Sequence, residues 1–142
     1  MDFRREIDKL LLNISETIVS GIKRNIKSGL FAKSPYGEPL DDSTIDSRRR
    51  RGVTSTVPLY DTGKFYNGLT SRRTATGTSI FSTGITEKAA AGAFFGKGHA
   101  PVRNPYNVKQ PIADKSMEEY AVTSFADGVL DIAVKLLSKN GV

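Results

Sequence analysis

The chain contains no cysteine and no tryptophan, and it has a single histidine. The missing cysteines exclude disulfide bonds, thiolate metal sites and a cysteine nucleophile, and they agree with synthesis in a reducing compartment. Aromatic residues make up only 8% of the 142 residues, whereas glycine occurs 13 times. We therefore expect one domain over residues 1–142 with a lean core, and long irregular segments that become ordered only against neighbouring proteins.

Long apolar segments are also missing. The N-terminal stretch from Met1 to Glu6 is charged, and it lacks the apolar region and the small-residue cleavage site of a signal peptide. No run approaches the ~18 consecutive apolar residues of a membrane-spanning helix. We therefore expect a protein that is made in the cytoplasm and makes no contact with a membrane.

Positive charge is concentrated in the middle of the sequence. The net charge is +6, and residues 22–103 carry fourteen basic and six acidic side chains. A surplus collected in one part of a chain favours contact with DNA or with an acidic protein surface.

Apolar residues at steps of three and four predict a helix over the first 28 residues, with Asp2 as its cap and Gly29 as its end. The stripe consists of Phe3, Ile7, Leu10, Leu11, Ile14, Ile18, Ile22 and Ile26. The simplest interpretation is a helix that lies on a sheet. The alternative is a coiled-coil seam with another subunit.

A second helix is predicted at the C-terminal end. Ser116 and Glu119 have the spacing of a capping box, and the apolar stripe that follows is Val122, Phe125, Val129, Ile132 and Leu136. Gly128 within this helix costs about 1 kcal/mol relative to alanine. A close approach of another element would explain why it is tolerated.

Three prolines and three glycines interrupt the segment from residue 29 to residue 60, with few apolar residues between them. We expect an extended arm there, ordered by a partner at about residues 29–58, with one short helix from about Thr44 to Arg51 after a capping box at Ser43. A helical turn carrying Phe65 and Leu69 is expected next, capped by Asp61 or Thr62.

The composition then changes to threonine, serine, isoleucine and phenylalanine, which predicts a β-hairpin over Ser71 to Ile85 with its turn near Thr76–Gly77. A short alanine-rich helix is expected from Glu87 to Phe95, capped by Thr86 and ended by Gly96. Residues 96–113 contain three prolines and are expected to be irregular.

Residue patterns that carry chemistry are weak in this sequence. His99 has no neighbouring carboxylate or nucleophile motif and is interpreted as a loop residue rather than a base or ligand. Gly92 to Gly98 differ from a phosphate-binding loop in glycine spacing, and a glycine follows Lys97. The acidic pairs Asp41–Asp42 and Glu118–Glu119 fit a loop and a first helical turn. We therefore expect no enzyme, no catalytic residue, no metal and no cofactor.

The strongest charge feature is the run Arg48, Arg49, Arg50 and Arg51. Three interpretations stay open: a solvated arm, a contact with an acidic protein, and sequence-independent contact with the phosphates of DNA. No known nucleic-acid-binding motif accompanies the run. Further candidates for facing a partner or DNA are Arg72, Arg73, Lys97 and Arg103.

Taken in order, several segments resemble the phage virion morphogenesis and tail completion proteins. Glu38-Pro39-Leu40, Ser43-Thr44-Ile45 and the arginine run are similar to that family's P-L-s-x-x-T-i-x-x-R stretch, and the segment from Pro58 to Leu69 is similar to its x-L-x-x-T-G-x-l-x-x-s-l segment. Further matches are Ala90-Ala91, Phe94-Phe95-Gly96 and the run from Pro101 to Tyr106. The resemblance extends over about residues 1–138, and the order of elements agrees throughout.

The resemblance implies an α+β fold in which long N-terminal and C-terminal helices pack on a small antiparallel sheet, with extended arms. It also implies a structural protein of the virion, a tail completion or neck protein at the head–tail junction. Such a protein would form a ring, with six copies expected, and would contact connector or head-closure proteins and tail tube or terminator proteins. Packaged DNA is a further expected contact, and a DNA-binding module using Arg48–Arg51 is the alternative function.

Overall fold

The N-terminal helix begins and ends where the sequence predicts. The computed structural model describes residues 2–83, 112–113 and 115–139, and its first helix, α1, spans Phe3–Lys27. The carboxylate of Asp2 accepts hydrogen bonds from the backbone N–H groups of Arg4 (3.0 Å) and Arg5 (3.4 Å). Gly29 follows the helix in the left-handed region, with φ of 78°. The predicted helix, its cap and its end are confirmed.

The Asp2 cap gives a first testable prediction. Asp2→Ala removes the acceptor of two otherwise unsatisfied N–H groups, so we expect the free energy of unfolding to fall by about 1 kcal/mol. Asp2→Asn keeps a side-chain acceptor at the same position and should retain most of that stability. Urea unfolding followed by circular dichroism measures both. Equal losses in the two variants would show that the cap contributes through its charge alone.

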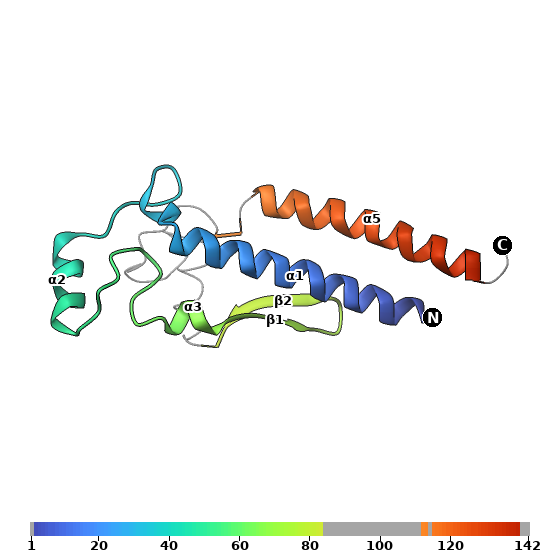
Figure 1. The fold of residues 1–142 in the computed structure, drawn as a ribbon, viewed down its shortest axis with the longest axis horizontal. Coiled ribbons are helices and arrows are strands. Elements are labelled where there is room, and N and C mark those ends of the chain that lie inside the picture. Colours follow the sequence, from blue (N-terminus) through green and yellow to red (C-terminus); the bar gives the residue numbers. More distant parts are fainter. Residues whose placement is uncertain (1, 84–111, 114, 140–142) are drawn as a thin grey trace.

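Three elements pack along one another (Figure 1). The C-terminal helix α5, Lys115–Lys139, runs antiparallel to α1, so that the two chain ends lie at the same end of the molecule. A hairpin of β1, Leu69–Arg73, and β2, Thr78–Ser82, lies along α1, which contacts the hairpin and α5. The α+β fold with a small antiparallel sheet and long terminal helices is confirmed.

The hairpin is antiparallel, with Leu69 opposite Ser82 and Arg73 opposite Thr78. Its turn closes through a 2.8 Å hydrogen bond from the N–H of Thr74 to the carbonyl of Gly77. The predicted hairpin and its turn are confirmed, whereas Ile85 lies outside the described residues. Because an isolated two-stranded hairpin is marginal in water, packing against α1 is what stabilises this one.

The hydrophobic core lies at the C-terminal half of α1. Ile22 and Ile26 are fully buried there, and the core is completed by Val19, Phe31, Leu59, Phe65, Leu69 and Ile112. The predicted α1 stripe is therefore buried toward its end. At its beginning the prediction is wrong for Phe3, which is 46% exposed, because no described residue covers the first turn of the helix.

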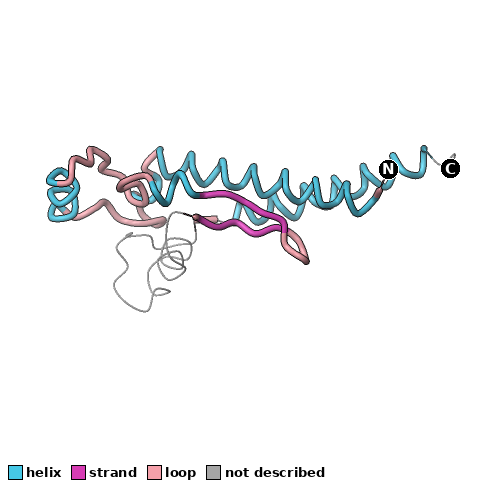
Figure 2. The backbone as a smooth tube through the Cα atoms, turned by 90° about the horizontal axis from the view of Figure 1, so that it is seen from below, coloured by secondary structure: helices cyan, strands magenta, loops and turns pink. Residues whose placement is uncertain are grey.

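The segment predicted as an arm contains a short 3₁₀ helix, η1, at Leu30–Ala32 and the helix α2 at Asp42–Arg50. Figure 2 shows α2 at the end of the molecule opposite the two chain termini. The segment is anchored to the body by buried side chains, namely Phe31, Leu40, Pro58 and Leu59. The arm is therefore not featureless, and its ordering by a partner stays a prediction.

The predicted caps of the two short helices are wrong. Helix α2 begins at Asp42 after Asp41, with no side-chain cap, so Ser43 lies inside the helix and forms no capping box. Helix α3, Lys64–Gly68, begins after Gly63 in the left-handed region, again without a side-chain cap. Asp61 does not cap α3 because its carboxylate is paired with arginine side chains.

Helix α5 packs by part of the predicted stripe, since Val129, Ile132 and Leu136 are half-buried. Ser116 lies inside the helix rather than at its cap, and Val122 (67%) and Phe125 (38%) are exposed. Gly128 lies against Leu10 of α1: a Cβ added at Gly128 would come within 2.5 Å of the Leu10 side chain. The close approach predicted at Gly128 is confirmed.

Several predictions concern other parts of the chain. The helix from Glu87 to Phe95, its cap Thr86 and its end at Gly96 lie outside the described residues, as does nearly all of the segment 96–113. Within that segment Ile112 is described, and it is buried in the core at 1% exposure. None of the described helices has the length and apolar character needed to cross a bilayer.

Candidate partner-binding surfaces

Arg48, the first arginine of the run, is buried and only 5% exposed. Its terminal nitrogen Nη1 donates hydrogen bonds to the carbonyl oxygens of Ser55 (3.1 Å), Val57 (2.9 Å) and Tyr60 (2.9 Å). One side chain of α2 therefore holds the whole return segment from residue 55 to residue 60 against that helix. Arg48 is a structural residue and does not belong to an exposed surface facing a partner or DNA.

The carboxylate of Asp61 is the negative charge next to the buried guanidinium of Arg48. Its carboxylate lies 3.8 Å from Nε of Arg48, too far for a hydrogen bond, and 2.9 Å from Nη2 of Arg51. Burial lowers the pKa of Arg48, the nearby Asp61 carboxylate acts in the opposite direction, and Arg51 adds to the lowering. The guanidinium nevertheless stays protonated, because arginine keeps its proton in proteins.

The remaining arginines of the run are on the surface in different states. Arg49 is paired with Asp46 at 3.7 Å, one helical turn earlier. Arg51 is paired with Asp61, and Arg50 is exposed with no ion pair among the described residues. The four arginines therefore do not form one free cationic face, and Arg50 alone is exposed and unpaired.

The other predicted basic residues are dispersed. Arg72 on β1 lies with its guanidinium carbon 4.5 Å from the ring centroid of Phe81. Arg73 at the end of β1 forms an ion pair with Asp8 of α1, which fastens the hairpin to that helix. Lys97, Arg103 and also His99 lie outside the described residues, so the structure places only six of the eight predicted surface residues.

Helix α5 presents an apolar surface that the sequence pattern had not singled out. It has no buried residue, and Leu130 (66%), Val134 (53%) and Leu137 (53%) are exposed. These three residues, which we call the apolar ridge, are spaced four and three apart and so lie along one face. The signal was present in the sequence, since α5 carries apolar residues on more than one face.

A second apolar feature lies between α1, β2 and α5. This groove has a volume of about 310 Å³, and its larger lining residues are Leu11, Ile14, Ile18, Ile80 and Phe125. The groove uses the side of α5 that carries Phe125, whereas the apolar ridge lies on a different side of the same helix. One protomer therefore offers two different apolar surfaces.

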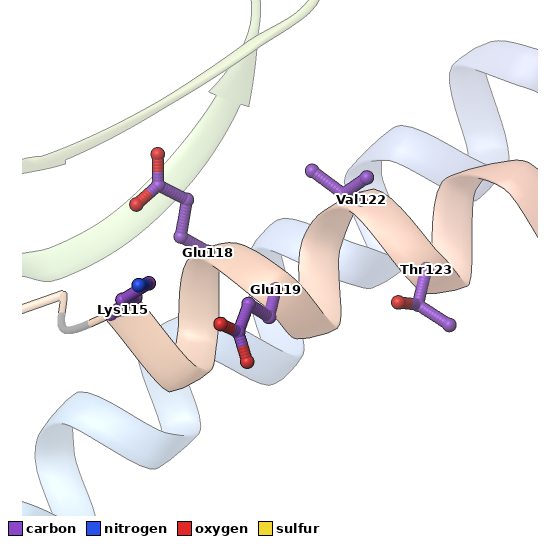
Figure 3. Close-up of a pocket in the computed structure, with 5 residues that line it drawn as sticks. All are labelled: Lys115, Glu118, Glu119, Val122 and Thr123. Atoms are coloured by element: carbon purple, nitrogen blue, oxygen red, sulfur yellow. The ribbon is translucent and has the colours of Figure 1, made fainter.

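A further depression runs along the first turns of α5 (Figure 3). Lys115, Glu118, Glu119, Val122 and Thr123 line it, and all five residues come from that one helix. The close-up shows the carboxylate groups of Glu118 and Glu119 pointing in different directions. Within the described ranges, no three acidic or histidine side chains are close enough together to hold a metal ion.

Comparison of the chain with protein-family models, with curated proteins and with solved structures finds no match. The candidate surfaces therefore rest on the geometry described above.

Proposed function

We propose that the chain is a structural protein of a bacteriophage virion, a tail completion or neck protein at the head–tail junction. In this proposal it is made in the cytoplasm of the host bacterium and assembles there into a ring. The ring, with six copies expected, joins the tail to the head connector. Its other partners are connector or head-closure proteins and tail tube or terminator proteins.

The observation that carries the proposal is the exposed apolar surface of α5. Large aliphatic side chains are more than half exposed along the apolar ridge. Contiguous exposed apolar surface on a protein of this size marks a binding surface for another protein. The order of sequence motifs that resembles tail completion proteins gives the second line of support.

A second copy of the chain is the occupant that the geometry favours for the ridge. Contact between two different surfaces of identical subunits is heterologous, and such contacts generate closed rings when the rotation between copies closes. The apolar groove is a concave surface of matching apolar character on another side of the protomer. We therefore assign the ridge of one copy to the groove of the next.

The alternative function, a DNA-binding module built on Arg48–Arg51, has less support. Arg48 is buried, and Arg49 and Arg51 have acidic partners. Most of that charge is used inside the protomer, so neutralising the run would disturb the fold before it tested any contact with DNA.

Assembly is tested by a triple variant of the ridge, Leu130→Gln, Val134→Gln and Leu137→Gln. Glutamine is a good helix former, so the helix should persist while the apolar surface is lost. We expect wild-type protein to reach six times the mass of one chain as its concentration rises, and the variant to stay monomeric in sedimentation equilibrium.

Val122→Gln is the matched control, because Val122 is equally exposed on α5 but lies outside both the ridge and the groove. We expect this variant to assemble as the wild type does. Assembly of the triple variant at wild-type concentrations would contradict the role given to the ridge.

A further inference from the structure

Basic side chains that have no acidic partner in the described part of the chain collect on the C-terminal half of α1. No acidic residue occurs between Glu16 and Glu38, while Lys23, Arg24 and Lys27 project from the last two turns of the helix. Among the described residues none of the three lies in an ion pair, in contrast to Arg48, Arg49, Arg51 and Arg73. Within the described ranges, this part of α1 therefore carries a cluster of three basic side chains outside any ion pair, whereas the arginine run has one, Arg50.

Two of these lysines lie over the same aromatic ring. The ammonium nitrogens of Lys23 and Lys27 are 5.3 Å and 5.4 Å from the ring centroid of Tyr66, and Lys27 is also 6.0 Å from that of Tyr60. The two tyrosine rings meet edge to face at 5.0 Å. Cation–π contact at an exposed site contributes only about 0.5–1 kcal/mol, and two ammonium groups beside one ring repel each other.

The segments that carry the two rings are anchored to the rest of the fold. Arg48 donates a hydrogen bond to the carbonyl of Tyr60, and Phe65, the neighbour of Tyr66 in α3, is buried in the core. Neither tyrosine hydroxyl has a hydrogen-bond partner among the described residues. The group of Lys23, Lys27, Tyr60 and Tyr66, which we call the basic–aromatic patch, thus places ammonium and hydroxyl donors side by side.

We propose that the basic–aromatic patch binds the phosphate backbone of double-stranded DNA. A phosphate group would be the anionic partner that neither lysine has among the described residues. Its oxygens accept hydrogen bonds from ammonium and hydroxyl groups. Lys27 and Arg24 of the same helix are exposed, while Lys23, Tyr60 and Tyr66 are half-buried. The positive charge thus extends along α1 over more than one residue, which suits a row of phosphates better than one small anion. The proposal stands without the ring. Within a ring at the head–tail junction it would give the subunits a contact with DNA.

The test measures binding to a fluorescein-labelled DNA duplex of mixed sequence by fluorescence anisotropy over a series of salt concentrations. The variant is Lys23→Gln together with Lys27→Gln. Each lost phosphate contact reduces the steepness of log K against log salt by about 0.9, so we expect a reduction of about 1.8 and weaker binding to every sequence. The charge-retaining variant Lys23→Arg with Lys27→Arg should bind as the wild type does.

The matched control is Lys115→Gln with Lys139→Gln, which removes the same charge from exposed positions on α5. We expect it to leave the salt dependence unchanged. If the double variant of α1 folds poorly, Lys27→Gln alone should reduce the slope by about 0.9.

Four results would overturn the proposal. The first is wild-type protein that shows no salt-dependent binding to the duplex. The second is an equal loss of DNA binding in the Lys23/Lys27 and Lys115/Lys139 glutamine variants, which would mean that net charge alone matters. Displacement of the duplex by inorganic phosphate at constant ionic strength would indicate a small-anion site. Loss of self-association with unchanged DNA binding would make the patch a subunit contact. None of these readouts depends on virion assembly. The proposed ring can therefore be disproved while DNA binding by the basic–aromatic patch is confirmed.

Discussion

Replacing Arg48 with alanine should lower the free energy of unfolding by about 3–5 kcal/mol, the largest effect that we expect of any single substitution. The variant loses the donor to three carbonyl oxygens. A polar group left buried without its partner costs about 1–3 kcal/mol, and the variant leaves three carbonyl groups without their donor. Loss of the contact also frees the segment from residue 55 to residue 60, which includes the core residue Leu59. Chemical denaturation measures the change.

Arg50→Ala is the control, because Arg50 lies on the same helix, is exposed and has no ion pair among the described residues. We expect a change within about 0.5 kcal/mol. The stability of the Arg48→Lys variant should lie between those of Arg48→Ala and Arg50→Ala. Its ammonium group can donate to the same carbonyls, but it does not have the planar shape of the guanidinium that fits the site. Equal stability of the Arg48→Ala and Arg50→Ala variants would contradict the buried role of Arg48.

Gly128→Ala should destabilise the protein by about 1–3 kcal/mol, although alanine is the better helix former. The added Cβ would lie 2.5 Å and 2.6 Å from the two terminal carbons of Leu10 and 3.1 Å from its branching carbon. Either Leu10 or the whole of α5 must move, and both responses loosen the contact between the two long helices. Thermal unfolding followed by circular dichroism measures the loss.

Gly21→Ala is the matched control in the same helix pair. There the added Cβ meets only the terminal methyl of Met117, at 3.3 Å, and that flexible side chain can yield. We expect Gly21→Ala to be neutral or stabilising by up to about 1 kcal/mol. Leu10→Ala should rescue Gly128→Ala in part, giving a favourable coupling energy in a double-mutant cycle. A stabilised Gly128→Ala variant would mean that the helices are farther apart than described.

The sequence predicted those parts of the fold that local patterns determine. Ile22 and Ile26 recur at helical spacing and are buried. No basic side chain of the described residues pairs with Asp2, and its cap forms as predicted. Asp61 shows why other caps were not predictable. A carboxylate close to two arginines is stabilised more by them than by the N-terminus of a five-residue helix, and those arginines come from another segment.

The packing of α5 shows a second limit. Apolar residues occur on several of its faces, and periodicity alone does not say which one meets α1. Gly128 decides it, because only a residue without a side chain permits the close approach to Leu10. The predicted stripe is therefore half-buried at Val129, Ile132 and Leu136 but wrong at Val122, and the face of Leu130 is left exposed.

The candidate surfaces followed from the sequence only in outline. A central basic surplus was predictable from composition, but the run of four arginines drew attention to residues that are largely paired or buried. Lys23 and Lys27 stand four residues apart and share a helix face, which a sequence can show. Their contact with Tyr66 depends on the tertiary fold, so it could not be predicted.

The most direct test of the proposed function is removal of the coding sequence from the genome of the phage that carries it, followed by electron microscopy of the lysate. We expect filled heads separate from unattached or malformed tails, and complete particles again when the wild-type protein is supplied in trans. The Leu130→Gln, Val134→Gln, Leu137→Gln variant should not restore them, whereas Val122→Gln should. Normal, infectious particles in the absence of the protein would contradict a structural role at the head–tail junction.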